Sequence, residues 1–600
     1  MSTSTTTPHV VGSFPQVTTK VNKRSKDFLE NVKRWEPILE TYQNALRASS
    51  SEGSANSVLK HTSRGQLRGM DSTPVCLEEN GSVDVPCATA RERVALLLDE
   101  DSPFLELQPF AGYENPDSSP AASLITGIGL INNVPTMIIA HIPSLKGGAW
   151  NYFTVQKQNR ATNVATKNNL PIVALVHSAG IYLPLQFHVF PYGGKLFRDL
   201  SVRTRKGHQS CAVVFGGSTA GGAYHPALSD YTIFVKGQAN VFLGGPPLVK
   251  MATGETVDAE DLGGAEMHAT VTGLADQLAV DEYETSRHLV IPPSMSNKGW
   301  KLTKPPPRWC RFDAIRKARE WVLTTTAARL VGRYSQPEVP PRPPLYDPEE
   351  LYGIVNPDIR QPLDMMEVLL RIVDDARLES FKPLWGKAMI TAWAYIHGHL
   401  TGIIANQRPI ISPDESDKST QFVHLCNQMK VPIIFLHNVT GFMVGLKAER
   451  AGLIKKGAKF VSAISTSLVP HISVLVGASY GAGNYAMCGR AFKPRFLFAW
   501  PNSRCSAMGP EQLSGVMESI TRTSAERSSR PVNEADLSAQ TEELKARVDR
   551  DSTAYRYSSY LHDDGIIDPR DTRDVLGMCL EVVKNTLITP NPGSMNLARI

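Results

Sequence analysis

The sequence has few of the features that mark several large protein classes. No apolar run reaches the roughly 18–20 residues that span a bilayer, so no transmembrane helix or membrane partner is expected. The 8 cysteines form no CxxC pair and no His/Cys metal spacing, which indicates free, mostly buried thiols, a reducing compartment and no bound metal. A net charge of +5 over 600 residues, without a dense basic stripe, argues against a dedicated nucleic-acid binder.

Two cofactor motifs are also missing. No Walker A or GxGxxG pattern is present. Met429-Lys430-Val431 lacks the second Met of the Met-Lys-Met sequence that carries biotin, and it follows a helix-like run over 421–428. Lys430 is therefore interpreted as a solvated lysine at a helix end.

What the sequence does contain is a glycine-rich turn. The apolar run Cys211-Ala-Val-Val-Phe215 predicts a buried strand, and Gly216-Gly-Ser-Thr-Ala-Gly-Gly-Ala-Tyr224 follows it and can open a helix. A glycine-rich strand-to-helix turn exposes backbone N–H groups that can hold a phosphate, a carboxylate or a developing oxyanion. The alternative is a tight turn in which glycine only relieves crowding.

A second copy of the turn favours the functional interpretation. Ile472-Ser-Val-Leu-Val-Gly-Ala-Ser-Tyr-Gly-Ala-Gly-Asn-Tyr485 has the same design, with Ser479 in the place of Ser218 and Gly483 in the place of Gly222. Two upstream segments, 124–129 and 170–178, recur as 389–394 and 431–439 at nearly the same offset of about 260 residues. Several elements that share one offset predict a duplicated domain.

Each half alternates Val/Ile-rich strands with helical stretches, which predicts an α/β layered fold. We expect an N-terminal tail and helix over 1–60, a first domain over 61–292, a proline-rich, extended linker over 293–357, and a second domain with a helical tail over 358–600. The expected elements of the first part are helices over 27–47, 91–98 and 150–168 and strands over 124–130, 136–140, 172–176 and 212–215.

One rival chemistry comes from Gly477-Ala-Ser-Tyr-Gly481, which matches the GxSxG elbow of serine hydrolases with Ser479 as the nucleophile. The twin turn argues against it, because Ala220 stands where the second glycine of that pattern should be. In addition, His562 is the one histidine after Ser479 that could complete a triad in hydrolase order.

Several longer motifs resemble the carboxyltransferase (β) subunit of biotin-dependent acyl-CoA carboxylases, and within that family the methylcrotonyl-CoA carboxylase β subunit most. The motifs are Gly217-Ser-Thr-Ala-Gly-Gly-Ala-Tyr224, Val241-Phe-Leu-Gly-Gly-Pro-Pro-Leu-Val-Lys250, Asp261-Leu-Gly-Gly-Ala265, Asn438-Val-Thr-Gly-Phe-Met-Val-Gly445, Ser479-Tyr-Gly-Ala-Gly-Asn-Tyr485, Met487-Cys-Gly-Arg490 and Trp500-Pro-Asn502. The resemblance runs from about His61 to about Asp568.

This resemblance implies two tandem crotonase-like domains, each a ββα superhelix, and transfer of a carboxyl group from carboxybiotin to an acyl-CoA thioester similar to 3-methylcrotonyl-CoA. It also implies a separate α subunit that carries the biotin carboxylase and the biotin carrier, a β6 homo-oligomer, and an active site between the first half of one subunit and the second half of another. A mitochondrial matrix location follows by analogy, and the Ser/Thr-rich, acid-free start of the chain, about 1–26, is compatible with a weak presequence or with a disordered tail. The ending Ala598-Arg599-Ile600 resembles a degenerate peroxisomal signal, so a peroxisomal or a cytoplasmic location is an alternative.

Two carbonyl oxygens become negative in such a transfer, one on biotin and one on the thioester, so two oxyanion holes are expected and no side chain is required as a general base. The expected donors are the backbone N–H groups of Gly221 and Gly222 in one turn and of Ala482 and Gly483 in the other. Residues expected to contact the substrates are Lys146, Gly147, Gly148, Ser178, Ala179, Gly180, Ala220, Ala223, Tyr224, Gly441, Phe442, Tyr480 and Gly481; the Lys146 segment is a candidate phosphate contact with an ordinary helix N-cap as the alternative.

The sequence departs from the family in one loop, where the methylcrotonyl-type pattern Asp-Ser-Gly-Gly-Ala-Tyr is replaced by His177-Ser-Ala-Gly-Ile-Tyr182. Ala179 and Ile181 are expected to add bulk beside the acyl-CoA and so to change the acyl pocket or reduce activity. A non-catalytic β-type scaffold subunit is therefore a further alternative. A plain crotonase-type hydratase would need paired glutamates near the turns, and neither turn contains one.

Overall fold

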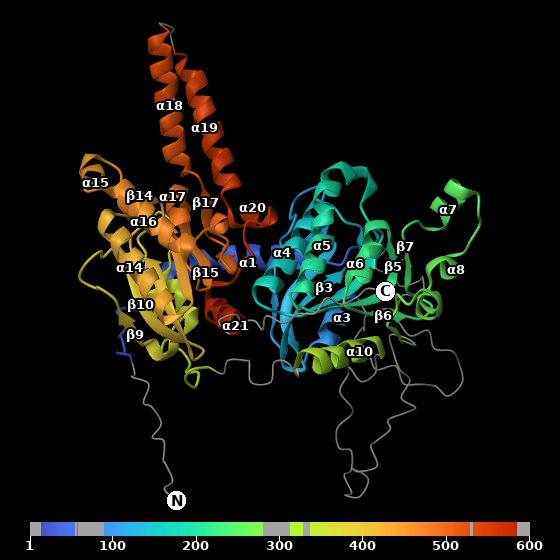
Figure 1. The fold of residues 1–600 in the computed structure, drawn as a ribbon. Helices are drawn as coiled ribbons and strands as arrows, with labels where there is room; N and C mark the ends of the chain where they lie inside the picture. The colour runs from blue at the N-terminus through green and yellow to red at the C-terminus, as the bar shows by residue number, and fades with distance from the viewer. Residues whose placement is uncertain are drawn as a thin grey trace, which may run out of the picture. The chain divides into compact units, whose positions relative to one another are not determined.

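The computed structural model describes residues 14–54, 57, 89–279, 313–327, 337–528 and 532–584 (Figure 1). The chain divides into two compact units: an N-unit, Arg47–Tyr334 with Thr589–Ile600, and a C-unit, Met1–Leu46 with Ser335–Ile588. Each unit has its own large mixed sheet with helices packed on it, which confirms the predicted duplicated α/β fold. The targeting signal predicted at 598–600 lies outside the described residues.

The N-unit sheet has 8 strands within the described residues, in the order β1-β2-β3-β4-β5-β6-β8, with β7 paired to β5. β1, β2 and β3 are antiparallel, whereas β3 to β6 run parallel. The strands are β1 Phe104–Glu106, β2 Leu124–Ile131, β3 Val134–His141, β4 Ile172–Ser178, β5 Ser210–Thr219, β6 Tyr231–Val235, β7 Asn240–Phe242 and β8 Gln277–Ala279. The helices are α3 Ala90–Leu97, α4 Tyr152–Lys167, α5 Gln186–Arg205, α6 Tyr224–Leu228, α7 Pro246–Thr253, α8 Ala259–Gly263, α9 Ala265–Met267 and α10 Asp313–Trp321.

The C-unit sheet repeats this plan, in the order β16-β15-β13-β11-β10-β9 with β17 paired to β15. Its strands are β9 Leu378–Ser380, β10 Met389–Ile396, β11 His399–Asn406, β13 Ile433–Val439, β15 His471–Tyr480, β16 Phe496–Ala499 and β17 Arg504–Ser506, and a small separate sheet joins β12 Ile410–Ile411 to β14 Gly441–Phe442. Its helices are α1 Lys26–Ser50 (whose last residues belong to the N-unit), α12 Leu351–Ile354, α13 Met365–Leu369, α14 Pro413–Met429, α15 Leu446–Arg450, α16 Leu453–Thr466, α17 Gly481–Ala486, α18 Pro510–Arg527, α19 Glu534–Asp551, α20 Ala554–Ser559 and α21 Thr572–Lys584.

Both sheets contain an equivalent antiparallel hairpin, β2–β3 in the N-unit and β10–β11 in the C-unit. Asn132 and Asn133 connect β2 to β3 with φ of 51° and 60°, and His397 and Gly398 connect β10 to β11 with φ of 48° and 75°. Two-residue turns with positive φ at both positions match the twist of the flanking strands. In each unit a long helix, α4 or α14, then returns the chain to the parallel part of the sheet.

A buried lysine supports the start of each hairpin, and sequence patterns had not pointed to it. In the N-unit, Lys157 of α4 donates to the carbonyl oxygen of Ala121 at 3.2 Å. In the C-unit, Lys418 of α14 donates to the carbonyl oxygens of Gly386 at 3.2 Å and Met389 at 2.8 Å. Burial lowers the pKa of Lys157 to about 7 and that of Lys418 to about 8. The duplication therefore extends to a polar contact between helix and sheet.

The predicted linker over 293–357 is partly wrong, because Asp313–Trp321 form helix α10. Its apolar side chains Ala314, Ile315, Ala318 and Trp321 are buried in the core of the N-unit together with α3. Helical spacing of these residues outweighs the dense prolines on either side. Residues 337–347, which carry part of the proline run, form neither helix nor strand, as expected, whereas Pro305-Pro-Pro307 lie outside the described residues.

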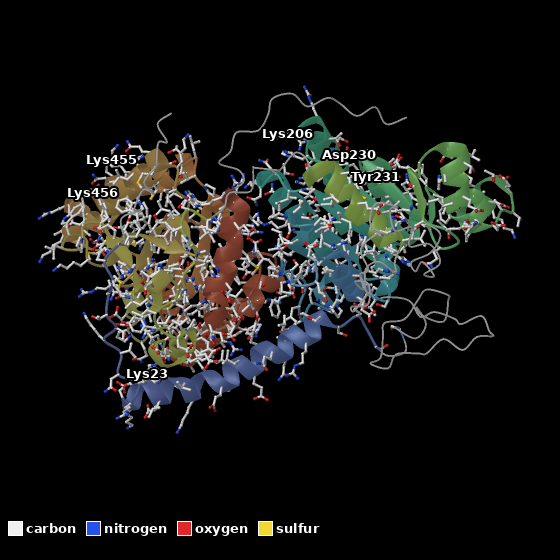
Figure 2. The ribbon with its side chains drawn as sticks, turned by 90° about the horizontal axis from the view of Figure 1, so that it is seen from below. Lys23, Lys206, Asp230, Tyr231, Lys455 and Lys456 are labelled. Atoms are coloured by element: carbon white, nitrogen blue, oxygen red, sulfur yellow. The ribbon has the colours of Figure 1, made fainter. Side chains whose placement is uncertain are left out.

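The predicted N-terminal helix is α1, and Figure 2 shows it as a long rod that begins near Lys23. Trp35 on α1 is fully buried and donates to the carbonyl oxygen of Val355 at 2.8 Å. At the other end, α21 is buried along most of its length, while α18 and α19 form an exposed hairpin. Each helix in the described residues is too short or too polar to cross a lipid bilayer.

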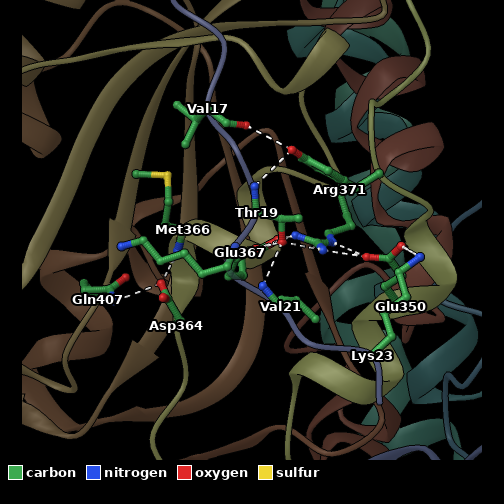
Figure 3. A network of polar contacts seen from close by, with 12 residues as sticks. Val17, Thr19, Val21, Lys23, Glu350, Asp364, Met366, Glu367, Arg371 and Gln407 are labelled. Carbon is green, nitrogen blue, oxygen red and sulfur yellow. Dashed lines mark hydrogen bonds and ion pairs between the residues drawn. The ribbon is translucent and has the colours of Figure 1, made fainter. Parts of the chain in front are cut away.

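The segment before α1, residues 14–25, packs on the C-unit and is called the strap below (Figure 3). Its Thr19 hydroxyl donates to Glu367 at 2.6 Å and accepts from Arg371 at 3.0 Å, and the Lys20 backbone N–H donates to Glu367 at 2.8 Å. Arg371 is fully buried and also pairs with Glu350, which Lys23 of the strap contacts as well. The prediction of a disordered tail up to about residue 26 is therefore wrong for residues 14–25, because contacts with buried charged side chains hold this segment in place.

Candidate functional site

The first glycine turn lies where β5 ends. Residues Ala220–Ala223 form a single 3₁₀ turn that leads into α6. Ala220 adopts φ of 52°, a left-handed conformation that is unfavourable for a residue with a Cβ. Gly222 is buried, and a Cβ on it would lie 3.3 Å from the Ser218 hydroxyl and 3.4 Å from Ser178. The turn therefore presents backbone against two hydroxyl-bearing side chains.

The second glycine turn lies at the end of β15 and begins with the same left-handed conformation. Gly481 adopts φ of 54° at the position equivalent to Ala220, and Gly481–Ala486 form α17. A Cβ on Gly483 would lie 2.6 Å from Val439 and 3.1 Å from the Cα of Gly441, so only glycine fits. In both turns the preceding residue makes no side-chain cap, which leaves the first backbone N–H groups available to a ligand.

A bulge in the neighbouring strand accompanies each turn. The β4–β5 register shifts between Val176 and Ser178, and the β13–β15 register shifts between His437 and Val439. The bulged residues are His177 and Asn438, and each lies against a glycine two residues before the turn serine. A Cβ on Gly216 would lie 2.3 Å from the His177 ring, and one on Gly477 would lie 2.6 Å from the Asn438 side-chain oxygen.

Two loops border the first turn and contain the remaining N-unit residues predicted for the site. Lys146, Gly147 and Gly148 have φ of 51°, 66° and 67°, and the carbonyl oxygen of Gly147 accepts from the Ala179 N–H at 2.9 Å. The backbone of Gly180 closes against the turn, because a Cβ there would lie 2.9 Å from the Thr219 carbonyl oxygen. The structure thus brings the two loops and the turn together at one edge of the N-unit sheet.

Lys146 lies exposed at this rim, with its ammonium 4.5 Å from the centre of the Tyr182 ring. An exposed lysine beside backbone N–H groups is suited to an anionic group of a ligand. Tyr224 is 42% exposed, as its counterpart Tyr485 is at 49%, so both turns place a tyrosine at the surface.

The loop that departs from the family pattern needs one correction. Ala179 is exposed, and its methyl group lies near Gly147, where it narrows the rim of the site as predicted. Ile181, however, packs against the cluster of Trp150, Val189 and Leu196. The bulk of Ile181 therefore enters the core of the N-unit rather than the space beside the turn.

A row of polar groups lies under the first turn. The Trp150 indole donates to His141 Nε2 at 3.0 Å, and Gln158 lies 3.1 Å from Nδ1 of His225, the residue after Tyr224. Burial lowers the pKa of His141 to about 4 and that of His225 to about 3. Both imidazoles are therefore neutral at neutral pH and act as fixed hydrogen-bonding supports.

A different polar group supports the second turn. His437 Nδ1 lies 2.9 Å from the Ser479 hydroxyl, and the Asn484 side chain donates to the same hydroxyl at 2.8 Å. Burial lowers the pKa of His437 to about 3. Val176 and Ala223 occupy the corresponding places in the N-unit, and the Ser218 hydroxyl is buried with no hydrogen-bond partner among the described residues.

These contacts decide against Ser479 as a hydrolytic nucleophile. The side chains of Ser479 and His437 are fully buried, so no substrate can reach the hydroxyl. His562, the histidine that the hydrolase order required, instead stacks on Tyr560 and makes a tilted ring contact with Tyr557. Ser479 is a structural hydroxyl below the turn, and in the described residues no cluster of His, Cys, Asp and Glu could hold a metal ion.

A large cavity of about 1640 Å³ lies in the C-unit beside the second turn. Asn438 of the bulge, Thr440 and Tyr480 line it, together with Arg408 and Arg504. Burial raises the pKa of Tyr480 to about 12, so its hydroxyl stays protonated and can donate a hydrogen bond at neutral pH. Predicted residues Gly441, Phe442 and Gly481 to Gly483 all belong to this half of the chain.

The sequence matches the Carboxyl transferase domain family over residues 87–308 and 310–595. It is 47% identical over 502 residues to a probable biotin-dependent acyl-coenzyme A carboxylase beta2 subunit of Mycobacterium tuberculosis, covering 83% of this chain and 88% of that one. It is 37% identical over 586 residues to the probable mitochondrial methylcrotonoyl-CoA carboxylase beta chain of Drosophila melanogaster, covering 96% and 94%. The crystal structure of the P. aeruginosa geranyl-CoA carboxylase beta subunit has a TM-score of 0.82 at 34% identity, covering 98% of this chain and 100% of that one.

Proposed function

Since the chain belongs to the carboxyl transferase family and is a carboxyltransferase subunit of a biotin-dependent acyl-CoA carboxylase, we propose that it carboxylates a 3-methyl-branched 2-enoyl-CoA. The single observation that supports this chemistry best is the pair of matching turns, each with uncapped backbone N–H groups at the end of a central parallel strand.

Biotin, carboxylated on a separate subunit, supplies the carboxyl group. The contribution of this chain is electrostatic: the N–H groups of Gly221 and Gly222 in one turn, and of Ala482 and Gly483 in the other, donate to carbonyl oxygens that become negative. Donors fixed in a rigid turn need no reorganisation when the charge develops. The buried neutral histidines beneath the turns hold this geometry and carry no proton to the substrate.

The proposed substrate class follows from what two similar proteins are named for. Methylcrotonyl and geranyl groups share a 3-methyl-2-enoyl thioester and differ in chain length. Ala179 narrows the rim beside the first turn, whereas the side chain of Ile181 points into the core, so the short branched acyl group is preferred. Lys146 is proposed to contact a phosphate of coenzyme A.

The proposed assembly is a β6 core with a biotin-bearing α subunit, in which the N-unit half-site of one copy meets the C-unit half-site of another. The exposed apolar side chains near each half-site support such a contact. Leu183, Phe187 and Phe190 are 71%, 83% and 76% exposed in the N-unit, and Val444 and Leu446 are 87% and 66% exposed in the C-unit. A mitochondrial location is proposed from similar chains that are named as mitochondrial.

The test is carboxyl transfer by the purified full chain, with free biotin and with a biotinylated α subunit, across methylcrotonyl-, geranyl-, propionyl- and acetyl-CoA. Turnover highest with methylcrotonyl-CoA, and lost in Gly222→Val and Gly483→Val variants that still form the native oligomer, supports the proposal. Folded, oligomeric protein that turns over none of these thioesters favours the non-catalytic scaffold instead. A preference for geranyl-CoA would support the proposed reaction but assign a longer acyl chain to the substrate.

A further inference from the structure

The residue that follows the second hairpin strand differs between the two units. The Ile142 N–H donates to the carbonyl oxygen of Ser123 at 3.0 Å, and the Gln407 N–H donates to that of Ala388 at 2.9 Å. The two pairs stand at the offset of about 260 residues that relates the halves, so the backbone contact is duplicated. Ile142 is buried in the core of the N-unit, whereas Gln407 is polar and only partly buried.

The Gln407 side chain joins the end of β11 to helix α13 (Figure 3). Its amide nitrogen donates to Asp364 at 3.1 Å, and Asp364 also caps α13 by accepting from the Met366 N–H at 3.1 Å. Glu367 of α13 pairs with the buried Arg371 at 2.6 Å and accepts hydrogen bonds from the strap. Gln407 is therefore anchored to a helix that buried charges and the strap hold in place.

The residues after Gln407 form the wall on which the second turn rests. The carbonyl oxygen of Pro409 accepts from the Thr440 N–H at 2.6 Å and from the Thr440 hydroxyl at 3.0 Å. Strand β12 then pairs in parallel with β14, which begins at Gly441. A Cβ on Gly483 would lie 3.1 Å from the Cα of Gly441, so the turn is in close contact with this wall. A displacement of Gln407 would therefore be passed through Gly441 to the turn.

The N-unit fixes the equivalent wall with different groups. Gly180 corresponds to Gly441, and its carbonyl oxygen accepts from the Trp150 N–H at 2.8 Å. The Trp150 indole in turn donates to the buried His141. Each unit thus has its own polar side-chain anchor for the segment beside its turn, and in the C-unit that anchor includes Gln407.

Only half of the Gln407 amide is used in this contact. Its Oε1 atom is buried and has no hydrogen-bond partner in the part of the chain that the structure describes. A buried polar atom without a partner lowers stability. Removal of the side chain therefore takes away one favourable hydrogen bond and one unfavourable group, so the stability should change little while the position of the wall changes.

We propose that Gln407 is a positioning residue for the second turn. Through Asp364 it holds the segment 407–411 against β14 and so keeps the backbone N–H groups of Ala482 and Gly483 in place. This inference rests on the proposed function, in which these N–H groups stabilise a developing negative charge. Small displacements of such donors lower the rate strongly, because catalysis depends on their prior alignment.

The first experiment measures carboxyl transfer with free biotin and thermal unfolding of single variants. Gln407→Ala is expected to lower kcat about tenfold at nearly unchanged unfolding temperature. Gln407→Glu, which sets a carboxylate against Asp364, should lower kcat at least as much. Asp364→Asn keeps an acceptor for Gln407 and a cap for α13, and should stay within about twofold of the wild type.

A matched control and a double-mutant cycle separate positioning from a general loss of structure. Gln421→Ala removes another glutamine hydrogen bond of the C-unit, the one with Lys382, and is expected to leave kcat unchanged. Combined with Gly483→Ala, Gln407→Ala should lower kcat by less than about twofold further, because the turn is already displaced. Combined with Gly222→Ala, it should keep its full effect of about tenfold.

Full additivity of Gln407→Ala in both glycine backgrounds, or a kcat within about twofold of the wild type in the single variant, overturns the positioning role. If the wild type turns over no thioester, the proposed function fails, and amide hydrogen exchange then decides about Gln407. Exchange about threefold or more faster over 481–487 in Gln407→Ala, with 220–228 unchanged, supports the positioning role. Equal exchange in the variant and the wild type over 481–487 overturns it.

Discussion

The two glycine turns begin with the same left-handed conformation but rest on different side chains. Ala220 and Gly481 have the same left-handed φ, and a strand bulge lies beside each turn. Under the second turn Ser479 is bonded to His437 and Asn484, whereas under the first turn the equivalent Ser218 hydroxyl has no partner among the described residues. The duplication thus preserved the left-handed residue and the strand bulge at each turn, whereas the supporting side chains diverged.

The largest effect should come from adding one methyl group to each turn. Gly483→Ala is expected to lower kcat about 100-fold or more, because its Cβ meets Val439 at 2.6 Å and the Gly441 backbone, which cannot move aside. Gly222→Ala is expected to cost about tenfold, because its Cβ meets only the hydroxyl and Cβ of serines at 3.3–3.4 Å.

Steady-state carboxyl transfer with free biotin measures both variants, with oligomeric state as the control for folding. Equal losses at the two positions would show that the turns are equally crowded and would contradict the difference described above.

The supporting groups of the two turns should also differ in how they make the unfolding free energy depend on pH. His437 has a folded pKa of about 3, below its unfolded value, so the unfolded chain binds the extra proton. Its contribution to stability is full above about pH 6.5 and falls by about 1.4 kcal/mol per pH unit as the pH drops toward 3. His437→Gln, which keeps a hydrogen-bonding group next to Ser479, is expected to flatten the acid side of the stability curve.

Urea unfolding between pH 7 and pH 5 checks this expectation, with His141→Gln in the N-unit as the matched variant, since His141 has a pKa of about 4. An unchanged slope for His437→Gln would mean that the imidazole is not the group that takes up the proton.

Removing the two serine hydroxyls should have opposite consequences. Ser479→Ala leaves Asn484 and His437 buried without their partner and is expected to cost about 1–3 kcal/mol of unfolding free energy. Ser218→Ala removes a buried, unbonded hydroxyl and is expected to be neutral or stabilising by up to about 1 kcal/mol. Thermal unfolding of the paired variants gives the comparison, and destabilisation of similar size at both positions would refute it.

The smallest effect concerns the left-handed residue that opens each turn. Ala220→Gly is expected to stabilise the N-unit by up to about 1 kcal/mol, because glycine adopts φ of 52° without strain. Gly481→Ala is expected to destabilise the C-unit by about 1–2 kcal/mol, since its Cβ would also lie 3.0 Å from the Ala507 carbonyl oxygen. Calorimetry on Ala220→Gly and Gly481→Ala measures both changes in unfolding free energy. Changes of opposite sign are expected, and a change of the same sign in both variants would contradict the prediction.

The duplicated strands and turns could be predicted because each is a local pattern that recurs at one offset. Contacts between distant positions could not: Ser479 meets His437 through the β13–β15 register, and Lys157 reaches Ala121 through the packing of α4 on the sheet. The helix α10 was hidden by the prolines around it. Ile181 packs against the cluster that contains Trp150, and the sequence pattern does not show that these two residues are in contact.

The strap has a consequence for proteolytic maturation. If a processing peptidase removed a leader through Lys26, it would take away the Thr19 hydroxyl and the Lys20 N–H that satisfy Glu367, and two buried carboxylates would be left to Arg371 alone. A buried charge that loses a partner is strongly destabilising. Cleavage compatible with a stable C-unit therefore falls before Thr19, and mass spectrometry of the N-terminus should find Thr19 and Lys20 in the protein.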